Sequence, residues 1–282
     1  MKALDMIDII ETVAPPGFAA SWDNSGVQVA ALREKIQSIA VLLDPTLDGL
    51  GRAVETGADF ILAHHPLLMQ PRYPNRSDDY LSILSLLFTH DIWLYSAHTS
   101  LDANPEGPVR WLAHELGLQS LEVLDSTAPL VPQPALSSLS PQSSLSPQLP
   151  QSGFGFIGIL PEVLSYNEFC RALSAALGKD SWQACGPRPA RVSRVACCPG
   201  AGTSLLAATA AAGADVYIAG DIKYHTALEA MSLGLHVLDV GHFILEEEMM
   251  RRLATQLAAA LPLPVHFIPG IDPITVERVR PA

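Results

Sequence analysis

The stretch of residues 38–66, SIAVLLDPTLDGLGRAVETGADFILAHHP, decides the fold class. Its apolar runs at 38–43 and 59–63 have the length and composition of buried strands, and a helical pattern at 46–56 separates them. A strand, a helix and a second strand in this order are typical of a βαβ unit, whose two strands lie parallel in one sheet. The stretch therefore predicts an α/β fold.

The same alternation continues on both sides of this stretch. Further strands are predicted at 92–96, 154–160, 194–198, 215–219, 236–240 and 265–268. Further helices are predicted at 78–89, 108–116, 165–177, 203–212, 224–233 and 243–260, with an amphipathic helix over residues 1–10. We expect two α/β domains with mainly parallel sheets.

A break in composition separates the two halves of the chain. Residues 126–152 are mainly Ser, Pro, Gln and Leu, and closely spaced prolines oppose both helix and sheet. We interpret them as a flexible or extended connector, with a docking motif for a partner as the alternative. The domains would then be 1–125 and 153–282, unless the last helix and strand return to the first domain.

The composition excludes several classes of protein. Apolar residues make up 49% of the chain, which is enough for a large core and argues against disorder. The formal charge of -12 disfavours binding of a long nucleic acid through a basic patch. A small phosphorylated ligand stays compatible with this charge if bound metal ions supply the positive charge.

The sequence also predicts where the protein resides. It contains no signal-peptide pattern and no apolar run long enough to span a membrane. The four cysteines have no CxxC spacing, so we expect them to be reduced and mostly buried. A cytoplasmic protein is the resulting expectation.

Polar side chains gather where three predicted strands end. His64 and His65 follow the strand at 59–63, Asp102 lies shortly after the strand at 92–96, and His242 follows the strand at 236–240. Ligands of open α/β sheets collect at these carboxyl ends. Glu246 lies one helical turn after His242, so both side chains can reach one ion.

Each of these signals is weak alone, because a single His at a strand end more often makes a structural hydrogen bond. Their co-occurrence in the right element types indicates a metal site. Imidazoles with carboxylates suit Zn, Fe or Mn. Two adjacent His and two carboxylates are also sufficient for two divalent ions that share a water.

Five motifs then resemble one family in order along the chain. They are Trp22-Asp23-Asn24-Ser25-Gly26, His64-His65-Pro66, Ala97-His98-Thr99-Ser100-Leu101-Asp102, Gly220-Asp221-Ile222-Lys223-Tyr224-His225 and Gly241-His242-Phe243-Ile244-Leu245-Glu246. They are similar to the Nif-three-like family, also called type 2 GTP cyclohydrolase I homologues or dinuclear-metal hexameric proteins. The match spans the chain except for the linker.

The resemblance implies a two-domain α/β fold, a toroidal homohexamer and a di-metal site in the cleft between the domains. The metal ligands that it implies are the same five residues: His64, His65, Asp102, His242 and Glu246. The chain departs from the family pattern at Ile244 and Leu245, where a Thr usually lies between the last His and the Glu.

Other residues are candidates for supporting roles. Asp23 and Asn24 are expected either to orient a ligand or to cap a helix. His98 is expected to act as a proton carrier or an outer hydrogen-bond partner, with a plain structural bond as the alternative. Lys223 and His225 are expected to contact an anionic substrate, or simply to begin a helix.

Two further features have simple interpretations. The turn at 198–203 precedes a helix; its amides could bind an anion, but an ordinary strand-to-helix turn is the preferred interpretation. Glu247 and Glu248 are expected to form a solvated helix face.

The preferred function is hydrolysis of a small anionic, nucleotide-like substrate by water that two ions activate. The resemblance suggests ring opening of a purine nucleotide. The alternatives are a non-enzymatic metal-binding or regulatory hexamer and a two-metal phosphoesterase. Open coordination positions would favour the enzyme, because structural sites are fully occupied by protein ligands.

Overall fold

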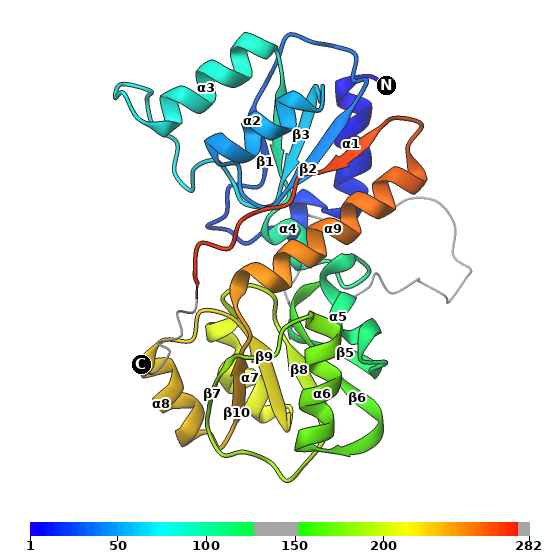
Figure 1. The fold of residues 1–282 in the computed structure, drawn as a ribbon, viewed down its shortest axis with the longest axis vertical. Helices are drawn as coiled ribbons and strands as arrows, with labels where there is room; N and C mark the ends of the chain where they lie inside the picture. The colour runs from blue at the N-terminus through cyan, green and yellow to red at the C-terminus, as the bar shows by residue number, and fades with distance from the viewer. Residues whose placement is uncertain (127–151, 276–282) are drawn as a thin grey trace, which may run out of the picture.

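The computed structural model describes residues 1–126 and 152–275, which form two β-sheets flanked by helices (Figure 1). The predicted α/β class is confirmed. Apart from its end residues Ser126 and Ser152, the predicted linker lies outside the described residues. None of the described helices is both long and apolar enough to cross a membrane.

The first sheet has the order β1-β4-β3-β2-β11. Its strands are β1 (Gly26–Val29), β2 (Ile39–Leu42), β3 (Phe60–Ala63), β4 (Trp93–Ser96) and β11 (Val265–Phe267). β4, β3, β2 and β11 run parallel, and β1 pairs antiparallel with β4 at one edge. The carboxyl ends of the parallel strands therefore lie along the same edge of the sheet.

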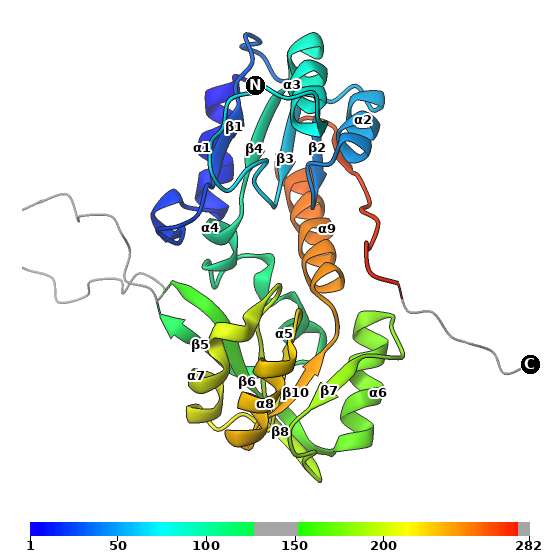
Figure 2. The same cartoon turned by 90° about the vertical axis from the view of Figure 1, so that its left-hand side faces the viewer.

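Both faces of the first sheet are covered, which explains its continuous apolar strands. The helices are α1 (Ala3–Val13), α2 (Leu47–Glu55), α3 (Asp79–His90) and α9 (His242–Ala260). Ile39 and Val41 of β2 belong to the core cluster that contains α1 and α9, whereas Ala40 and Leu42 belong to the cluster that contains α2 and α3. Figure 2 shows the two pairs of helices on opposite faces.

The second sheet has the order β5-β6-β8-β9-β10-β7. Its strands are β5 (Gln119–Ser126), β6 (Gly153–Ser165), β7 (Gln183–Cys185), β8 (Arg191–Cys197), β9 (Val216–Ala219) and β10 (His236–Asp239). β8, β9 and β10 are parallel and the remaining pairs are antiparallel. Its helices are α5 (Trp111–Glu115), α6 (Tyr166–Leu177), α7 (Leu206–Ala211) and α8 (Tyr224–Ser232).

The predicted helices are present, and local capping explains where three of them begin. Thr46, Asp78 and Ser165 each accept a hydrogen bond from the third backbone amide of α2, α3 and α6. Two predicted helices begin instead with a short 3-10 turn, at Pro108–Arg110 and at Gly202–Leu205.

Three strands were not predicted, and all three lie at a sheet edge. β1, β5 and β7 pair antiparallel and are partly exposed, so they lack the continuous apolar run of a buried strand. Residues of β5 were assigned to the first domain, but β5 pairs with β6 in the second sheet. The sequence did not indicate which sheet β5 joins, because its partner β6 lies beyond residues 127–151 in the chain and the local pattern does not encode this pairing.

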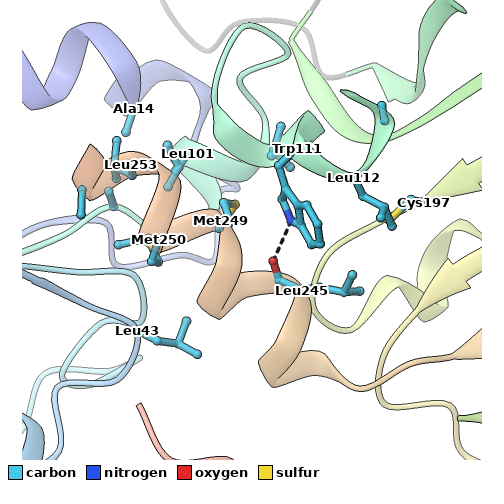
Figure 3. Close-up of a cluster of buried hydrophobic side chains, with 14 of the residues drawn as sticks. Ala14, Leu43, Leu101, Trp111, Leu112, Cys197, Leu245, Met249, Met250 and Leu253 are labelled. Carbon is cyan, nitrogen blue, oxygen red and sulfur yellow. Dashed lines mark hydrogen bonds between the residues drawn. The ribbon is translucent and has the colours of Figure 1, made fainter. Parts of the chain in front are cut away.

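The long helix α9 joins the two sheets. It starts just after β10 of the second sheet, packs against β2 of the first, and leads into β11, which pairs with β2. One buried core cluster contains its residues together with strands of both sheets. Figure 3 shows Trp111 in this core, where its indole N–H donates to the Leu245 carbonyl oxygen over 2.9 Å.

Candidate metal centre

The five predicted ligands meet between the two sheets, next to the carboxyl ends of β3, β4 and β10. His64 and His65 directly follow β3, and Asp102 ends the short helix α4 (Thr99–Asp102) that follows β4. His242 and Glu246 occupy the first two turns of α9, which begins after β10 of the other sheet. The cluster therefore depends on the crossing of α9 from one sheet to the other (Figure 2).

The Glu246 carboxylate lies at the centre of the cluster. Its Oε1 lies 3.7 Å from His64 Nε2, and its Oε2 lies 3.2 Å from His65 Nε2 and 2.7 Å from His242 Nε2. The Oδ1 of Asp102 is also 3.7 Å from His64 Nε2. Ligands around one tetrahedral zinc ion are separated by about 3.4 Å, given metal–ligand distances of about 2.0–2.1 Å. The separations of 3.2 and 3.7 Å therefore suit an ion between these atoms, whereas the 2.7 Å between His242 and Glu246 is that of an ion pair.

Several of these atoms are buried without any hydrogen-bond partner in the described part of the chain. They are Nε2 of His64, Nε2 of His242, Oδ1 of Asp102 and Oε2 of Glu246. Buried polar atoms nearly always have a partner, and an unpartnered one is costly. Four such atoms that converge on one place fit a bound cation.

The four imidazoles around the cluster each have a hydrogen-bond partner at Nδ1, the ring nitrogen opposite Nε2. The Nδ1 contacts are His64 with the Ala97 carbonyl oxygen at 2.8 Å, His65 with Asp44 at 2.7 Å, His98 with Asp23 at 2.6 Å, and His242 with Asp221 at 2.8 Å. A carbonyl oxygen only accepts, so His64 Nδ1 donates, and in the neutral ring Nε2 is the nitrogen that can bind a metal ion. Metal-binding histidines are usually oriented in this way.

Asp44 and Asp221 were missed as site residues in the sequence analysis. Each follows the end of a parallel strand, β2 or β9, and this position was the available signal. Asp221 adopts a left-handed conformation with φ 60°, which Asp tolerates better than most residues. This conformation lets its carboxylate reach His242.

The protonation equilibria also indicate that positive charge is required here. Burial alone would lower the pKa of His65, but its contacts with Asp44 and Glu246 raise the pKa to about 10. For His242, burial is likewise outweighed by Glu246 and Asp221, and the pKa rises to about 9. Burial raises the pKa of Asp102 to about 7. Without metal the cluster therefore holds protons.

Two glycines make room for the cluster. Gly200 has φ +72°, and a Cβ there would press against Glu246 Oε1. A Cβ on Gly220 would lie 2.5 Å from the backbone nitrogen of His242. The turn at 198–203 is a strand-to-helix turn, as preferred, and its glycine admits the Glu246 carboxylate.

The predicted supporting residue His98 lies at the cluster. Its ligand atom lies within 4.8 Å of those of His64 and His65, so the three imidazoles could hold one ion; a second such group is His65, His242 and Glu246. Asp23 accepts from His98 and from the Thr99 hydroxyl. Although burial opposes it, these hydrogen bonds hold the pKa of Asp23 well below its usual range.

The structure places other predicted residues away from the cluster. Asn24 donates to the Leu68 carbonyl oxygen, and Lys223 lines a smaller cavity beside α8. His225 is exposed and packs against Tyr224. The prediction of a solvated Glu247 was wrong: it is 7% exposed and accepts from the Gly270 amide, because α9 lies inside the molecule.

Two cavities open on the cluster, and His242 lines both of them. One, of about 660 Å³, is lined by His65, His242 and Lys179 among others. The other, of about 340 Å³, is lined by Trp22, His98 and Asp102 among others. The candidate ligands are thus accessible to a small molecule.

Comparison with known proteins identifies the family of this chain. The model of the Duf34/NIF3 family (NGG1p interacting factor 3) matches residues 1–273. A Clostridium perfringens protein named "GTP cyclohydrolase 1 type 2 homolog" is 30% identical over 270 residues, which cover 95% of each chain.

Solved structures show the same fold. Reduced HcgD from Methanocaldococcus jannaschii has a TM-score of 0.78 at 29% identity, and the alignment covers 95% of this chain and 98% of that one. The protein ybgI, described as being of unknown function, has a TM-score of 0.80 at 26% identity, covering 97% and 100% of the two chains.

Proposed function

Because this chain belongs to the Duf34/NIF3 family, we propose that it is a metal-dependent hydrolase that acts on a small, nucleotide-like substrate. Two divalent ions (Zn, Fe or Mn) would be held by His64, His65, Asp102, His242 and Glu246. The relatives' name, "GTP cyclohydrolase 1 type 2 homolog", makes a purine nucleotide the first substrate to test.

One observation carries this proposal: buried, unpartnered ligand atoms converge while the opposite nitrogen of each imidazole is held in place. A structural histidine would use both nitrogens within the protein. Here Nε2 of His64 lies 3.7 Å from the carboxylates of Asp102 and Glu246, beyond hydrogen-bond distance, and Nε2 of His242 has only the Glu246 carboxylate beside it, at 2.7 Å. This arrangement leaves the centre incomplete without a cation.

The Glu246 carboxylate supports two ion positions. Its Oε1 faces His64, near Asp102, whereas its Oε2 faces His65 and His242. A carboxylate has two oxygens and can bind an ion with each, which a neutral imidazole cannot do. When bound, two such ions polarise the substrate and make a water more acidic.

The protein's own residues would then position the substrate and move a proton. Asp23 accepts a hydrogen bond from His98 Nδ1–H, so in the neutral ring Nε2 carries the lone pair that would accept a proton from water. His98 also lines the smaller cavity, so its ring can exchange that proton with solvent. Asp44 and Asp221 keep His65 and His242 oriented.

A homo-oligomer, expected as a hexamer, belongs to the same proposal. Tyr224, Leu228 and Met231 lie one turn apart along α8 and are exposed by 73%, 45% and 60%. An apolar stripe of this kind supports contact with another copy. Analytical ultracentrifugation would test the stoichiometry.

The test of the hydrolase measures metal content and turnover on the same preparations. The unmodified protein should contain about two ions per chain and convert GTP or a phosphoester. Asp102→Ala should lose metal and activity together. His98→Ala should keep both ions and turn over roughly 100-fold more slowly, as for a lost proton carrier.

Two results would change this assignment. Loss of an ion in His98→Ala would make His98 a ligand instead of a proton carrier. Metal-loaded protein that converts nothing in a broad screen would support the non-enzymatic alternative.

A further inference from the structure

The 660 Å³ cavity beside His65 and His242 has the size of a small-molecule site. Its walls come from both halves of the molecule. Residues 43–44 after β2 and residues 272–274 after β11 contribute from the first half, and residues 179–183 and 239–243 contribute from the second sheet and the start of α9. A ligand in this cavity would therefore touch the candidate metal ligands and both sheets at once.

Lys179 brings a positive charge to this cavity. It is half-buried, and its ammonium group donates to the Val240 carbonyl oxygen over 2.9 Å. A Cβ built on Gly241, next to His242, would lie 3.5 Å from Lys179 Nζ. An ammonium group has three donors, and the described residues provide a partner for one. The ammonium group can therefore hold an anion close to the ions.

The carboxylates that line the same cavity are held by other partners. Asp44 and Asp221 contact imidazoles, Asp239 accepts from the amides of Ile222 and Gly241, and Asp272 accepts from the amide of Ile274. In the described residues none of these carboxylates forms an ion pair with Lys179 within 4 Å. No carboxylate therefore competes with a ligand for direct contact with the ammonium group.

Trp182 adds a flat apolar wall three residues after Lys179. It is half-buried, packs against the main core and lines the cavity. An indole ring stacks well on a planar heteroaromatic ring. Lys179 and Trp182 lie on the short segment between α6 and β7, so the two contacts are held close together.

We propose that Lys179 and Trp182 form the subsite that recognises a phosphorylated, planar heteroaromatic substrate. Lys179 binds the phosphate and Trp182 packs against the ring, beside His65 and His242, which would hold an ion. The inference rests on the proposed function and deepens it. It transfers anion binding from Lys223, which lines a different cavity, to Lys179.

The test compares three probes on metal-loaded protein: GTP, guanosine and inorganic triphosphate. Dissociation constants are measured at low temperature, and the recovered ligand is checked for conversion. Lys179→Ala should weaken GTP and triphosphate by about 10- to 100-fold and leave guanosine unchanged. Trp182→Ala should weaken GTP and guanosine by about 10-fold and leave triphosphate unchanged.

Matched controls exist in the chain. Lys223→Ala removes the same charge outside this cavity, and Phe88→Ala removes an exposed aromatic ring on α3 that lines neither this cavity nor the smaller one. Both should bind GTP as the unmodified protein does, with metal content unchanged in all four variants. The subsite would be overturned if Lys179→Ala and Trp182→Ala bound all three probes as tightly as the unmodified protein does. It would also be overturned if the unmodified protein did not bind GTP.

The outcomes separate the subsite from the proposed function. The expected binding pattern without any conversion of ligand supports the subsite and contradicts the hydrolase. Conversion of GTP with an unchanged KM in Lys179→Ala and Trp182→Ala supports the hydrolase and contradicts the subsite.

Discussion

At the scale of single residues, the carboxylates of the centre attract positive charge, which either protonated imidazoles or metal ions can supply. His65 and His242 have pKa values raised to about 10 and 9 because Glu246, with Asp44 or Asp221, outweighs burial. Both imidazoles are therefore protonated at neutral pH in the metal-free protein. A metal ion must displace those protons before it can bind.

This competition predicts proton release. Zinc added to metal-free protein at pH 7.5 should release about two protons per chain, because both raised pKa values lie above that pH. The apparent affinity should rise as the pH rises toward 9 and fall in acid. Calorimetry in two buffers of different ionisation enthalpy measures the number; a value near zero would contradict it.

Asp221 should matter although it does not touch an ion. Its carboxylate holds His242 Nδ1 at 2.8 Å, so Asp221→Asn should weaken zinc binding by roughly 10- to 100-fold in a chelator competition. Asp272→Asn is the control, since Asp272 lines the same cavity without contacting an imidazole. Equal losses of zinc affinity in both variants would mean that the negative charge of the cavity, and not the orientation of His242, is responsible.

At the scale of elements, the ligands depend on tight turns next to the strand ends. Gly200 lies in the turn between β8 and the following 3-10 helix, and its left-handed backbone and missing Cβ leave room for Glu246. The Glu246 side chain can occupy its position only if this turn stays open.

Gly200→Ala should therefore reduce both stability and metal affinity. The strained backbone alone should cost about 1–3 kcal/mol, and the new Cβ displaces the Glu246 carboxylate. Gly51→Ala is the control: Gly51 lies inside α2 with nothing near its Cβ position, so the change should stabilise by about 0.5–1 kcal/mol. Thermal melts and metal titrations of both variants would decide; unchanged zinc affinity in Gly200→Ala would contradict the packing argument.

At the scale of the whole molecule, the two sheets share one core through α9. Its first turns carry His242 and Glu246, and the rest of the helix packs on the first sheet. The same helix thus joins the sheets and completes the centre.

The ends of the Ser/Pro/Gln segment are neighbours in the second sheet. Ser126 pairs with Gly153 across antiparallel β5 and β6, and such partners are about 5 Å apart. Replacing residues 127–151 by four residues with Asn-Gly at their centre should keep the fold and the metal content. The shorter connection should stabilise by roughly 1–2 kcal/mol. A marked drop in Tm would show instead that the segment contributes packing.

The sequence by itself determined the α/β class, most strands and helices, and five residues that the structure brings together. These features are local: apolar runs mark buried strands, caps such as Thr46 mark helix starts, and polar residues at parallel strand ends share one edge. Glu246 was found because helical spacing links it to His242.

Only the tertiary structure decided the remainder. The edge strands β1, β5 and β7, the burial of Glu247, and the roles of Asp44, Asp221 and Lys179 follow from where α9 crosses and which strands pair. The local sequence pointed to Lys223, whereas Lys179 is the lysine that lines the cavity with His65 and His242. Contacts between distant segments decide such questions, and no local pattern encodes them.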